Sequence, residues 1–387
     1  MPTFKRGSST PGYVRLGTLR AAARRPPGFG RAMRAVVTRG GSLVVDEVDD
    51  PTPGEGQVLV RSLAAGICGS DLHVLADVAR FAGLMARVGV PTLDPASDSV
   101  FGHEFCAELV DYGPGADRSL PVGTRVCSVP VIIGPAGLEQ IGYSNTYPGA
   151  LAERFTLQEA LLLPVPDTLP TELAALTEPL AVGGHAVGLA ELQAGQPCLV
   201  VGCGPVGLAV IAALKARSHG PVIAADFSPT RRRLAEALGA DEVVDPSDHS
   251  PHDRWHELGV PVTMIERATA AFLGGETKEP VIFEAVGVPG MLEGLIADAP
   301  PRSRIVVVGV CMDRDAFEPF MAVTKEIELR FSFGYSLEEF AATLGRLADG
   351  MPGADRLVTA TVPLDEAPRA FDILRAPGGH GKILVTP

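Results

Sequence analysis

A glycine-rich turn between an apolar strand and an apolar helix places the strongest constraint on the fold of this 387-residue chain. The apolar residues 199–201 are followed by GCGPVG at residues 202–207, and residues 208–214 continue as an apolar helical run. Glycines at this spacing allow a tight turn, and the N-terminus of a helix attracts anions. We therefore expect a dinucleotide to bind at this turn. The expected contact residues are Gly202, Gly204, Pro205, Val206 and Gly207.

The glycines of this turn have separate expected roles. Gly202 permits the turn, Gly204 lets the backbone approach a pyrophosphate, and Gly207 lets the helix pack closely on the strand. The next strand, residues 222–225, ends at Asp226, nineteen positions after Gly207. A carboxylate at that position can bind both ribose hydroxyls of NAD.

Two local signals for the choice of cofactor oppose each other. Asp226 would repel the 2'-phosphate of NADP, whereas Arg231, Arg232 or Arg233 could hold that phosphate. Successive helical residues point in different directions, so only one of these arginines could reach the ribose. Because repulsion from Asp226 would outweigh one exposed arginine, we predict NAD as the cofactor.

Short apolar strands alternate with helical segments after residue 196, and this alternation predicts a parallel, doubly wound α/β sheet. Helix signals agree, because Ser228 and Pro229 open a helix that Gly239 closes, and Ser336 with Glu339 forms a capping box. Asp365 is expected to open another helix before a last strand at residues 382–385. The expected strands of the parallel sheet are residues 198–201, 222–225, 242–244, 281–285 and 305–308.

The stretch from Met33 to about residue 190 has a different texture. Short apolar runs alternate with Gly- and Pro-rich breaks, which predicts barrel-like β structure with irregular loops. A strand that begins at Met33 is expected to form a hairpin with residues 43–45. Residues 75–88 have helical spacing and predict a short helix, which either serves packing alone or also borders a substrate pocket.

Charge and composition limit the possible partners. A net charge of −13 disfavours nucleic acid and anionic membranes, so a small molecule is the expected partner. Residues 1–34 carry eight Lys or Arg and no Asp or Glu, and we expect residues 1–32 to be a disordered basic extension. The six cysteines show no paired framework, which indicates free thiols and one metal ligand in a reducing, cytoplasmic environment.

A second group of residues points to a metal. The sequence GICGSDLH at residues 66–73 is followed by GHE at residues 102–104. Cys68, His103 and Glu104 offer a thiolate, an imidazole and a carboxylate, a set that suits zinc. Alone, Cys68 would be interpreted as a core thiol and His103 as a structural histidine. Their combination with a dinucleotide fold favours the metal site.

Together with TEPL at residues 177–180, these motifs resemble those of the zinc-dependent medium-chain dehydrogenase/reductase family. The resemblance extends from Met33 to the C-terminus and is closest to the polyol, butanediol and threonine dehydrogenase branch, in which glutamate precedes Pro-Leu. It implies a GroES-like β-barrel catalytic domain at residues 33–185 and a Rossmann NAD-binding domain at residues 186–331. Residues 332–387 would then complete the catalytic domain.

The same resemblance implies the zinc ligands. Cys68 and His103 would be direct ligands, and Glu104 would be either a ligand or a nearby carboxylate that exchanges with water. Glu178 would be the remaining protein ligand. An open fourth position would let the metal bind the substrate oxygen and lower the pKa of a bound alcohol.

Proton transfer is also implied by the resemblance. Ser70 would accept the alcohol proton and pass it through the cofactor ribose toward His73. We assign Asp71, in the same turn, to local hydrogen bonds with the backbone. His185 is interpreted as a packed helix residue, and Cys203 as a residue that simply fits the glycine turn.

The expected function is hydride transfer between a secondary alcohol or polyol and NAD, with one zinc ion per chain. A second, structural zinc is not expected, because residues 113–149 contain only Cys127, whereas many relatives carry four closely spaced cysteines there. The alternatives are NAD(P)H-dependent reduction of an aldehyde or ketone, and a regulatory protein that binds zinc and NAD without turnover. A homo-oligomer, dimer or tetramer, is expected.

Overall fold

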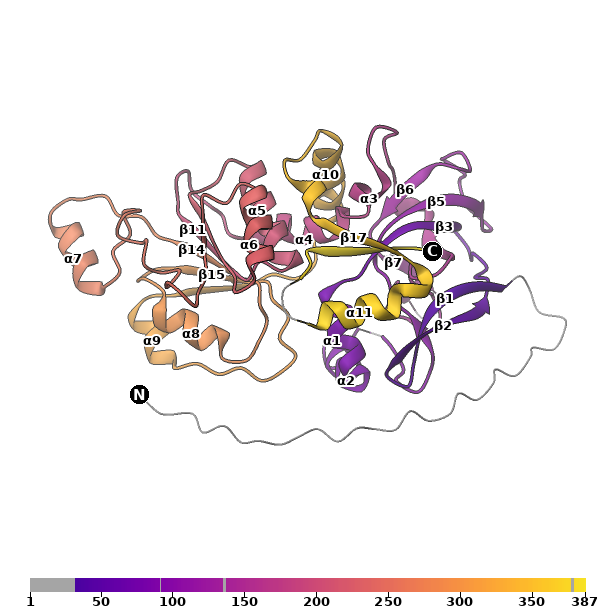
Figure 1. The fold of residues 1–387 in the computed structure, drawn as a ribbon, viewed down its shortest axis with the longest axis horizontal. Helices are drawn as coiled ribbons and strands as arrows, with labels where there is room; N and C mark the ends of the chain where they lie inside the picture. The colour runs from indigo at the N-terminus through magenta and orange to yellow at the C-terminus, as the bar shows by residue number, and fades with distance from the viewer. Residues whose placement is uncertain (1–31, 91, 135–136, 377–378) are drawn as a thin grey trace.

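The computed structural model describes residues 32–90, 92–134, 137–376 and 379–387, arranged around two main sheets (Figure 1). The extension predicted for residues 1–32 lies outside the described residues, except for Ala32. No described helix combines the length and apolar character that a bilayer crossing requires.

A parallel sheet of six strands confirms the predicted doubly wound fold. Its strands are short apolar runs because helices lie over both faces, with α5 and α6 on one side and α8 and α9 on the other (Figure 1). The strand order is β13 (Glu242–Val244), β12 (Val222–Ala225), β11 (Cys198–Val201), β14 (Val281–Glu284), β15 (Arg304–Val307) and β16 (Glu328–Phe331). The helices are α5 (Pro205–Ala216), α6 (Pro229–Ala237), α7 (Met264–Phe272), α8 (Met291–Asp298) and α9 (Pro319–Thr324).

A seven-stranded, mainly antiparallel sheet, a three-stranded sheet and a hairpin form the β structure expected for the catalytic part. The predicted hairpin at Met33 is present, and Gly40 and Gly41 make its turn with positive φ angles. The large sheet contains β10 (Leu162–Pro164), β6 (Arg125–Ser128), β5 (Glu104–Tyr112), β3 (Gln57–Gly66), β18 (Lys382–Thr386) and β17 (Val358–Pro363), with β9 (Arg154–Gln158) also on β3. The other strands are β1 (Ala32–Arg39), β2 (Ser42–Asp49), β4 (Ser99–Val100), β7 (Val131–Gly134) and β8 (Gly137–Gln140).

The last segment of the chain returns from the parallel sheet to the antiparallel one. After β16, helix α10 (Leu337–Ala348) packs against α4 (Thr177–Leu189), and α11 (Ala367–Arg375) connects β17 to β18. Strand β18 pairs antiparallel with β3, and its residues Ile383, Leu384 and Val385 are buried. This pairing places the C-terminal strand beside the end of β3, where the GICGSDLH motif begins.

One hydrophobic core runs from one sheet to the other. It joins Cys106 of β5, Leu180 of α4, Val200 of β11, Leu208 of α5 and Leu384 of β18. Helix α4 also packs against α5, so the first helix after the glycine turn is tied to the helix that carries Glu178. The shared core fixes the two sheets relative to each other and brings both motifs to one region.

The local structure differs from the sequence expectation in three places. Residues 75–88 are not one helix but the end of α1 (Gly69–Ala76) and α2 (Val78–Arg87), because the Asp77 side chain accepts the Arg80 N–H and caps a new helix. Asp365 lies in a short 3₁₀ turn, Leu364–Glu366, before α11. The sixth parallel strand, β16, was not predicted, because its sequence ELRF alternates charged and apolar residues.

Candidate active site

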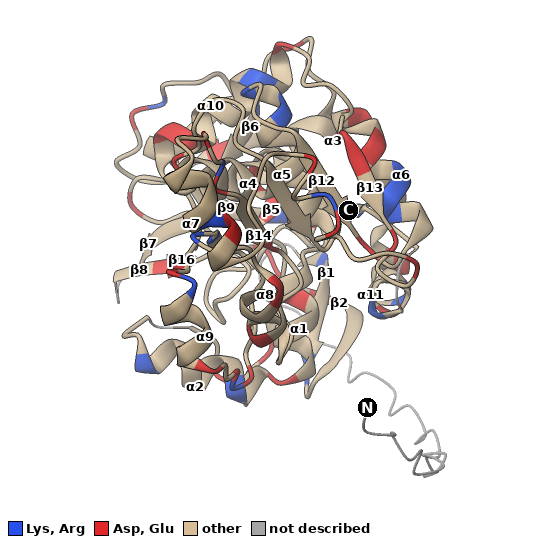
Figure 2. Ribbon diagram, turned by 90° about the vertical axis from the view of Figure 1, so that its left-hand side faces the viewer, with Lys and Arg blue, Asp and Glu red and all other residues tan. Residues whose placement is uncertain are grey.

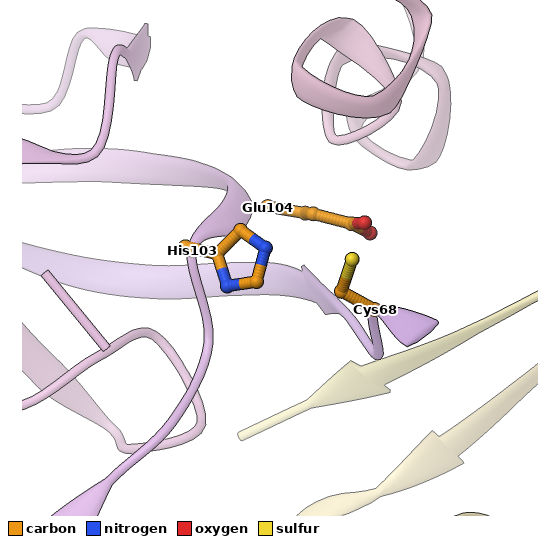
Figure 3. A group of neighbouring side chains, drawn as sticks. All are labelled: Cys68, His103 and Glu104. Atoms are coloured by element: carbon orange, nitrogen blue, oxygen red, sulfur yellow. The ribbon is translucent and has the colours of Figure 1, made fainter. Parts of the chain in front are cut away.

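Three side chains with metal-binding chemistry meet at the ends of β3 and β5. Cys68 follows β3, and Glu104 opens β5 next to His103. The antiparallel register pairs Gly66 with Glu104, which brings the two motifs together although they are far apart in sequence. One ligand atom from each of Cys68, His103 and Glu104 lies within 4.8 Å of the others (Figure 3).

Glycine is required where β3 passes the Glu104 carboxylate. A Cβ atom on Gly66 would lie 2.1 Å from Glu104 Oε2, so any other residue would push the Glu104 carboxylate away from its position beside Cys68 and His103. Gly102, with φ +110°, also has no space, because a Cβ atom there would lie 2.6 Å from the Leu151 backbone nitrogen. Close approach therefore accounts for Gly66 and Gly102, whereas an added Cβ atom on Gly69 would meet no atom within 4 Å.

His103 is oriented by a buried carboxylate. Its Nδ1 lies 3.5 Å from Asp71 Oδ1, while the other ring nitrogen points toward the space between Cys68 and Glu104 (Figure 3). Asp71 also accepts the Cys68 backbone N–H at 3.0 Å, which confirms its predicted local role. Burial lowers the pKa of His103, but the charges of Asp71 and Cys68 outweigh burial and hold this pKa well above its usual value.

Glu104 forms an ion pair with Lys382 that is almost completely buried. Lys382 Nζ lies 2.7 Å from Oε1 and 2.6 Å from Oε2 of Glu104, and it also donates to the Ile67 carbonyl at 3.1 Å. Burial lowers the pKa of Lys382, whereas the charges of Glu104 and Cys68 raise it and prevail. Sequence reasoning missed this lysine, which lies 278 residues from its partner.

The donor set of this group fits a zinc ion. A soft thiolate, an imidazole and a carboxylate are the ligands that zinc prefers. At the site itself, Glu104 Oε2 is buried without a hydrogen bond of good geometry, although Lys382 lies 2.6 Å from it. Buried polar atoms without a hydrogen bond are uncommon in folded proteins and are frequent where an ion binds.

Glu178, the fourth expected ligand, stands beside this group but is not a member of it. It lies in the first turn of α4, and its Oε1 accepts a hydrogen bond of 2.9 Å from the Tyr335 hydroxyl. Burial is the main cause that raises the pKa of Glu178 to about 7. The charge of His103 lowers this pKa, and the charge of Glu104 raises it. Tyr335 was missed by sequence reasoning, because a single tyrosine between β16 and α10 carries no local signal.

Ser70 and His73, the expected proton-transfer residues, lie on α1. The Tyr143 hydroxyl lies 2.8 Å from Ser70 Oγ and 2.9 Å from Asp71 Oδ1, whereas His73 is exposed. A tyrosine hydroxyl has one proton and an ionised Asp71 can only accept, so Tyr143 donates to Asp71 and Ser70 donates to Tyr143. This contact leaves the lone pairs of Ser70 free to accept a proton.

Tyr143 is also part of an aromatic wall. Its ring packs against Phe81 of α2, Phe101 and the imidazole of His103, with centroid distances of 5.3, 5.8 and 5.1 Å. Helix α2 therefore reaches the site through Phe81. It also contacts the loop that follows β15, because Arg80 donates to the Met312 carbonyl at 2.8 Å and pairs with the neighbouring Asp313 carboxylate at 2.7 Å.

The glycine turn has the geometry that a dinucleotide needs. Gly202 has φ +91°, and a Cβ atom on Gly207 would lie 1.8 Å from the Gly202 carbonyl oxygen. Gly204 faces open space, with no atom within 4 Å of an added Cβ, and Pro205 opens α5 directly after it. The turn therefore combines tight packing on one side with an open approach to the helix N-terminus on the other.

Asp226 follows β12 and is anchored to this turn. Its Oδ2 accepts the Cys203 N–H at 2.8 Å and its Oδ1 accepts the Ser228 N–H at 2.7 Å. The three arginines lie on α6 (Figure 2), and only Arg231 faces the carboxylate, at 3.9 Å. Arg232 pairs with Asp245 at 2.7 Å and donates to the Asp226 backbone carbonyl at 2.7 Å, and Arg233 donates to Thr230 Oγ1 at 3.1 Å.

The remaining residues discussed from the sequence lie elsewhere. His185 Nδ1 lies 2.9 Å from Glu339 Oε2 and so joins α4 to the capping box of α10. Cys127 is buried, and its thiol donates to the Ala174 carbonyl. All six cysteines are free.

A metal-binding group beside a dinucleotide-binding sheet defines a metal- and nucleotide-dependent oxidoreductase. Residues 54–167 match the alcohol dehydrogenase GroES-like domain, and residues 205–349 match the zinc-binding dehydrogenase domain. The (R,R)-butanediol dehydrogenase of Bacillus subtilis (strain 168) is 33% identical over 356 residues, which cover 89% of this chain and 96% of that protein. The chain belongs to the zinc-dependent medium-chain dehydrogenase/reductase family, in its polyol and butanediol branch.

Other relatives extend this comparison. The L-threonine 3-dehydrogenase of Thermococcus kodakarensis is 31% identical over 374 residues, which cover 92% of this chain and 97% of that protein. The crystal structure of the Bacillus subtilis butanediol dehydrogenase superposes with a TM-score of 0.74 at 30% identity, covering 92% and 99% of the two chains. A putative zinc-binding dehydrogenase from Sinorhizobium meliloti 1021, bound to NADP, superposes with a TM-score of 0.72 at 28% identity, covering 92% and 100%.

The two glycines of the turn should respond differently to a methyl group. We expect Gly207→Ala to lower the free energy of unfolding by about 1–3 kcal/mol or more, because the new Cβ meets the Gly202 carbonyl. Gly204→Ala should change stability by less than about 0.5 kcal/mol but weaken NADH binding on the order of tenfold, because its Cβ fills the approach to the phosphates. Urea unfolding and NADH fluorescence titration measure the two effects, and equal stability losses would contradict this interpretation.

Lys382 should be essential for stability in the metal-free protein. We expect Lys382→Met to lower the free energy of unfolding by about 3–5 kcal/mol, because Glu104 is left buried without its cation. Lys215→Met is the matched control, since Lys215 pairs with Asp241 at the surface and should contribute less than about 1 kcal/mol. Urea unfolding of both variants in the presence of a chelator measures the difference. Equal losses of unfolding free energy in the two variants would show that the buried ion pair stabilises the protein no more than the surface pair does.

Proposed function

We propose that this enzyme transfers hydride between a secondary alcohol or polyol and NAD at a single zinc ion held by Cys68, His103 and Glu104. The observation that carries the proposal is the grouping of these three side chains within 4.8 Å, beside a glycine turn open to a dinucleotide. The relatives named butanediol and sorbitol dehydrogenase support the substrate class. In the forward direction the alcohol carbon loses a hydride and its oxygen loses a proton, which gives a ketone.

The side chains around this centre have different roles. A zinc ion bound there acts as a Lewis acid that polarises the substrate oxygen and lowers the pKa of the alcohol. Asp71 keeps the His103 ring in one orientation, as carboxylates commonly do for ligating histidines. Lys382 compensates the charge of Glu104, and Glu178 supplies a further carboxylate at the edge of the site.

Ser70 is the proposed first proton acceptor. Its hydroxyl is held by Tyr143, and its lone pairs remain available to the substrate. When Ser70 accepts the alcohol proton, its own hydroxyl proton must turn from Tyr143 to the cofactor ribose, and His73, exposed on the same helix, is the proposed exit from the ribose to solvent. The same residues serve aldehyde or ketone reduction when the proton and hydride move in the opposite direction, so that reaction is the second candidate direction at this site.

The metal and the substrate class can be tested together. We expect about one zinc per chain and NAD reduction with a subset of a panel of secondary alcohols, diols, sugar alcohols and 3-hydroxy amino acids. Cys68→Ala should lose zinc and turnover but still bind NADH, because the glycine turn is formed by other elements. Cys311→Ala, which removes another partly exposed thiol, is the control and should keep its zinc. Metal analysis finding two tightly held zinc ions per chain, or full activity in Cys68→Ala, would refute the proposal.

We propose NAD rather than NADP as the preferred cofactor. The Asp226 carboxylate is fixed by two backbone N–H groups, and an ionised group held there would repel a 2'-phosphate. Arg232 donates to the Asp226 backbone carbonyl at 2.7 Å and pairs with Asp245, and Arg233 donates to Thr230, which leaves Arg231 as the one of the three that faces the Asp226 carboxylate. The relative from Sinorhizobium meliloti is bound to NADP, so membership of the family does not set the preference by itself.

Comparing kcat/KM for the two cofactors with one alcohol tests this assignment. The wild-type enzyme should prefer NAD, and Asp226→Ser should shift the ratio toward NADP by on the order of tenfold or more, because like-charge repulsion is removed. Arg233→Ala, whose guanidinium donates to Thr230 Oγ1 and not to Asp226, should leave the ratio unchanged. A wild-type preference for NADP would refute the role given to Asp226.

We also propose that the protein forms a homo-oligomer and that it is located in the cytoplasm. Among the described residues β16 pairs only with β15, and its free edge, with Phe331 exposed, supports association with a second copy, because an edge strand can pair with another chain. Light scattering of the purified protein would decide between one, two and four chains.

The six free thiols support a reducing compartment. We also propose the boundaries 33–185, 186–331 and 332–387 for the domains.

A further inference from the structure

Two carboxylates face the proposed zinc centre, and each has a different partner. Glu104 is paired with the Lys382 cation inside the group of three ligands. Glu178 lies outside that group, and its Oε1 is held by the neutral hydroxyl of Tyr335 at 2.9 Å. Among the described residues, Tyr335 is the only side chain that donates a hydrogen bond to Glu178.

The Tyr335 hydroxyl is held in place from the α10 side. The ring packs against Phe340 with a centroid distance of 5.4 Å, and Ser336 directly after it begins the capping box of α10. The box residue Glu339 is in turn bound by His185 of α4. His185 and Glu178 are seven positions apart, two turns on one face of α4, so α10 docks on this face at two polar contacts. The packing of two helices therefore fixes the position from which Tyr335 donates its hydrogen bond to Glu178.

We propose that Tyr335 is a positioning residue that holds Glu178 outside the inner ligand set and so keeps one coordination position open for the substrate oxygen. This inference rests on the zinc site of the proposed function. A buried carboxylate that lost its donor would turn toward the nearest positive charge. In a site with zinc that charge is the metal, and a fourth protein ligand would close the site, as in structural zinc sites.

The change in zinc affinity on removal of the Tyr335 hydroxyl depends on whether Tyr335 restrains Glu178 or delivers it to the metal. If Tyr335 delivered Glu178 to the metal as a ligand, removing the hydroxyl would weaken zinc binding. If Tyr335 restrains Glu178, removing the hydroxyl strengthens zinc binding and blocks the open position. The sign of one change in affinity therefore separates the two roles.

The test uses Tyr335→Phe in the full-length enzyme, a change that keeps the ring and removes the hydroxyl. Competition with a chromogenic chelator should show a zinc dissociation constant lower by on the order of tenfold, a typical size for changes beside the ligands. In the Co²⁺-substituted protein, added imidazole should change the visible spectrum of the wild type but not of the variant. With the active alcohol, kcat/KM should fall by on the order of tenfold.

Two further variants make the result specific. Tyr112→Phe removes a hydroxyl bonded to the Leu120 backbone, away from the site, and should leave zinc affinity unchanged. Tyr335→Phe combined with Glu178→Gln should lose the gain in affinity and regain the response to imidazole. Glu178→Gln alone should keep the zinc dissociation constant within about threefold of wild type if, as we propose, this carboxylate is held outside the inner ligand set.

Several outcomes would overturn the inference. Zinc binding that is weaker or unchanged in Tyr335→Phe would contradict it. A tenfold or larger loss of zinc affinity in Glu178→Gln would also contradict it, and this second measurement does not require Tyr335→Phe to fold. In each of these cases a wild-type enzyme with one zinc and normal turnover leaves the proposed function standing. A wild-type protein that binds no zinc would overturn both.

Discussion

Several acidic groups that are buried or half-buried meet at one point of this fold, and the rest of the structure accommodates that constraint. Cys68, Glu104 and Glu178 would repel each other and lose hydration if they were left without partners. Lys382 and Tyr335 are those partners, and both come from the last sixty residues of the chain. The return of the C-terminal segment to the antiparallel sheet is therefore required by the chemistry of the site as well as by the packing of β18 on β3.

The parts of the site that sequence reasoning predicted are those in which neighbouring residues act together. The glycine turn, the Cys68 motif and the His103–Glu104 pair each carry their spacing within a few residues, so a pattern can reveal them. The partners that it missed are distant: 278 residues separate Lys382 from Glu104, 157 separate Tyr335 from Glu178, and 73 separate Tyr143 from Ser70. A single lysine or tyrosine gives no local sign of the group that it will meet, because only the sheet register and helix packing bring the two together.

The fold was predicted more completely than the site, for a related reason. Buried parallel strands and capped helices have strong local signals, and five strands of the six-stranded sheet were predicted within one residue of their ends. The errors are at places where local and tertiary preferences compete. Asp77 could have signalled the break between α1 and α2, because aspartate favours helix caps over helix interiors. β16 is partly exposed at the edge of the sheet, and its alternating polarity hides it from a search for continuous apolar runs.

Asp226 shows how one side chain can serve both the fold and its selectivity. Each of its oxygens already accepts one backbone N–H, from Cys203 in the glycine turn and from Ser228 at the cap of α6. A carboxylate offers about four lone-pair sites, so two remain for the two hydroxyls of a ribose. The bonds that hold the turn therefore also fix the direction of the remaining lone pairs. Arg231, at 3.9 Å, lies beyond hydrogen-bond distance, so it offsets part of the negative charge without occupying a lone pair of the carboxylate. Selectivity at this position thus depends on a charge that the local fold cannot easily move.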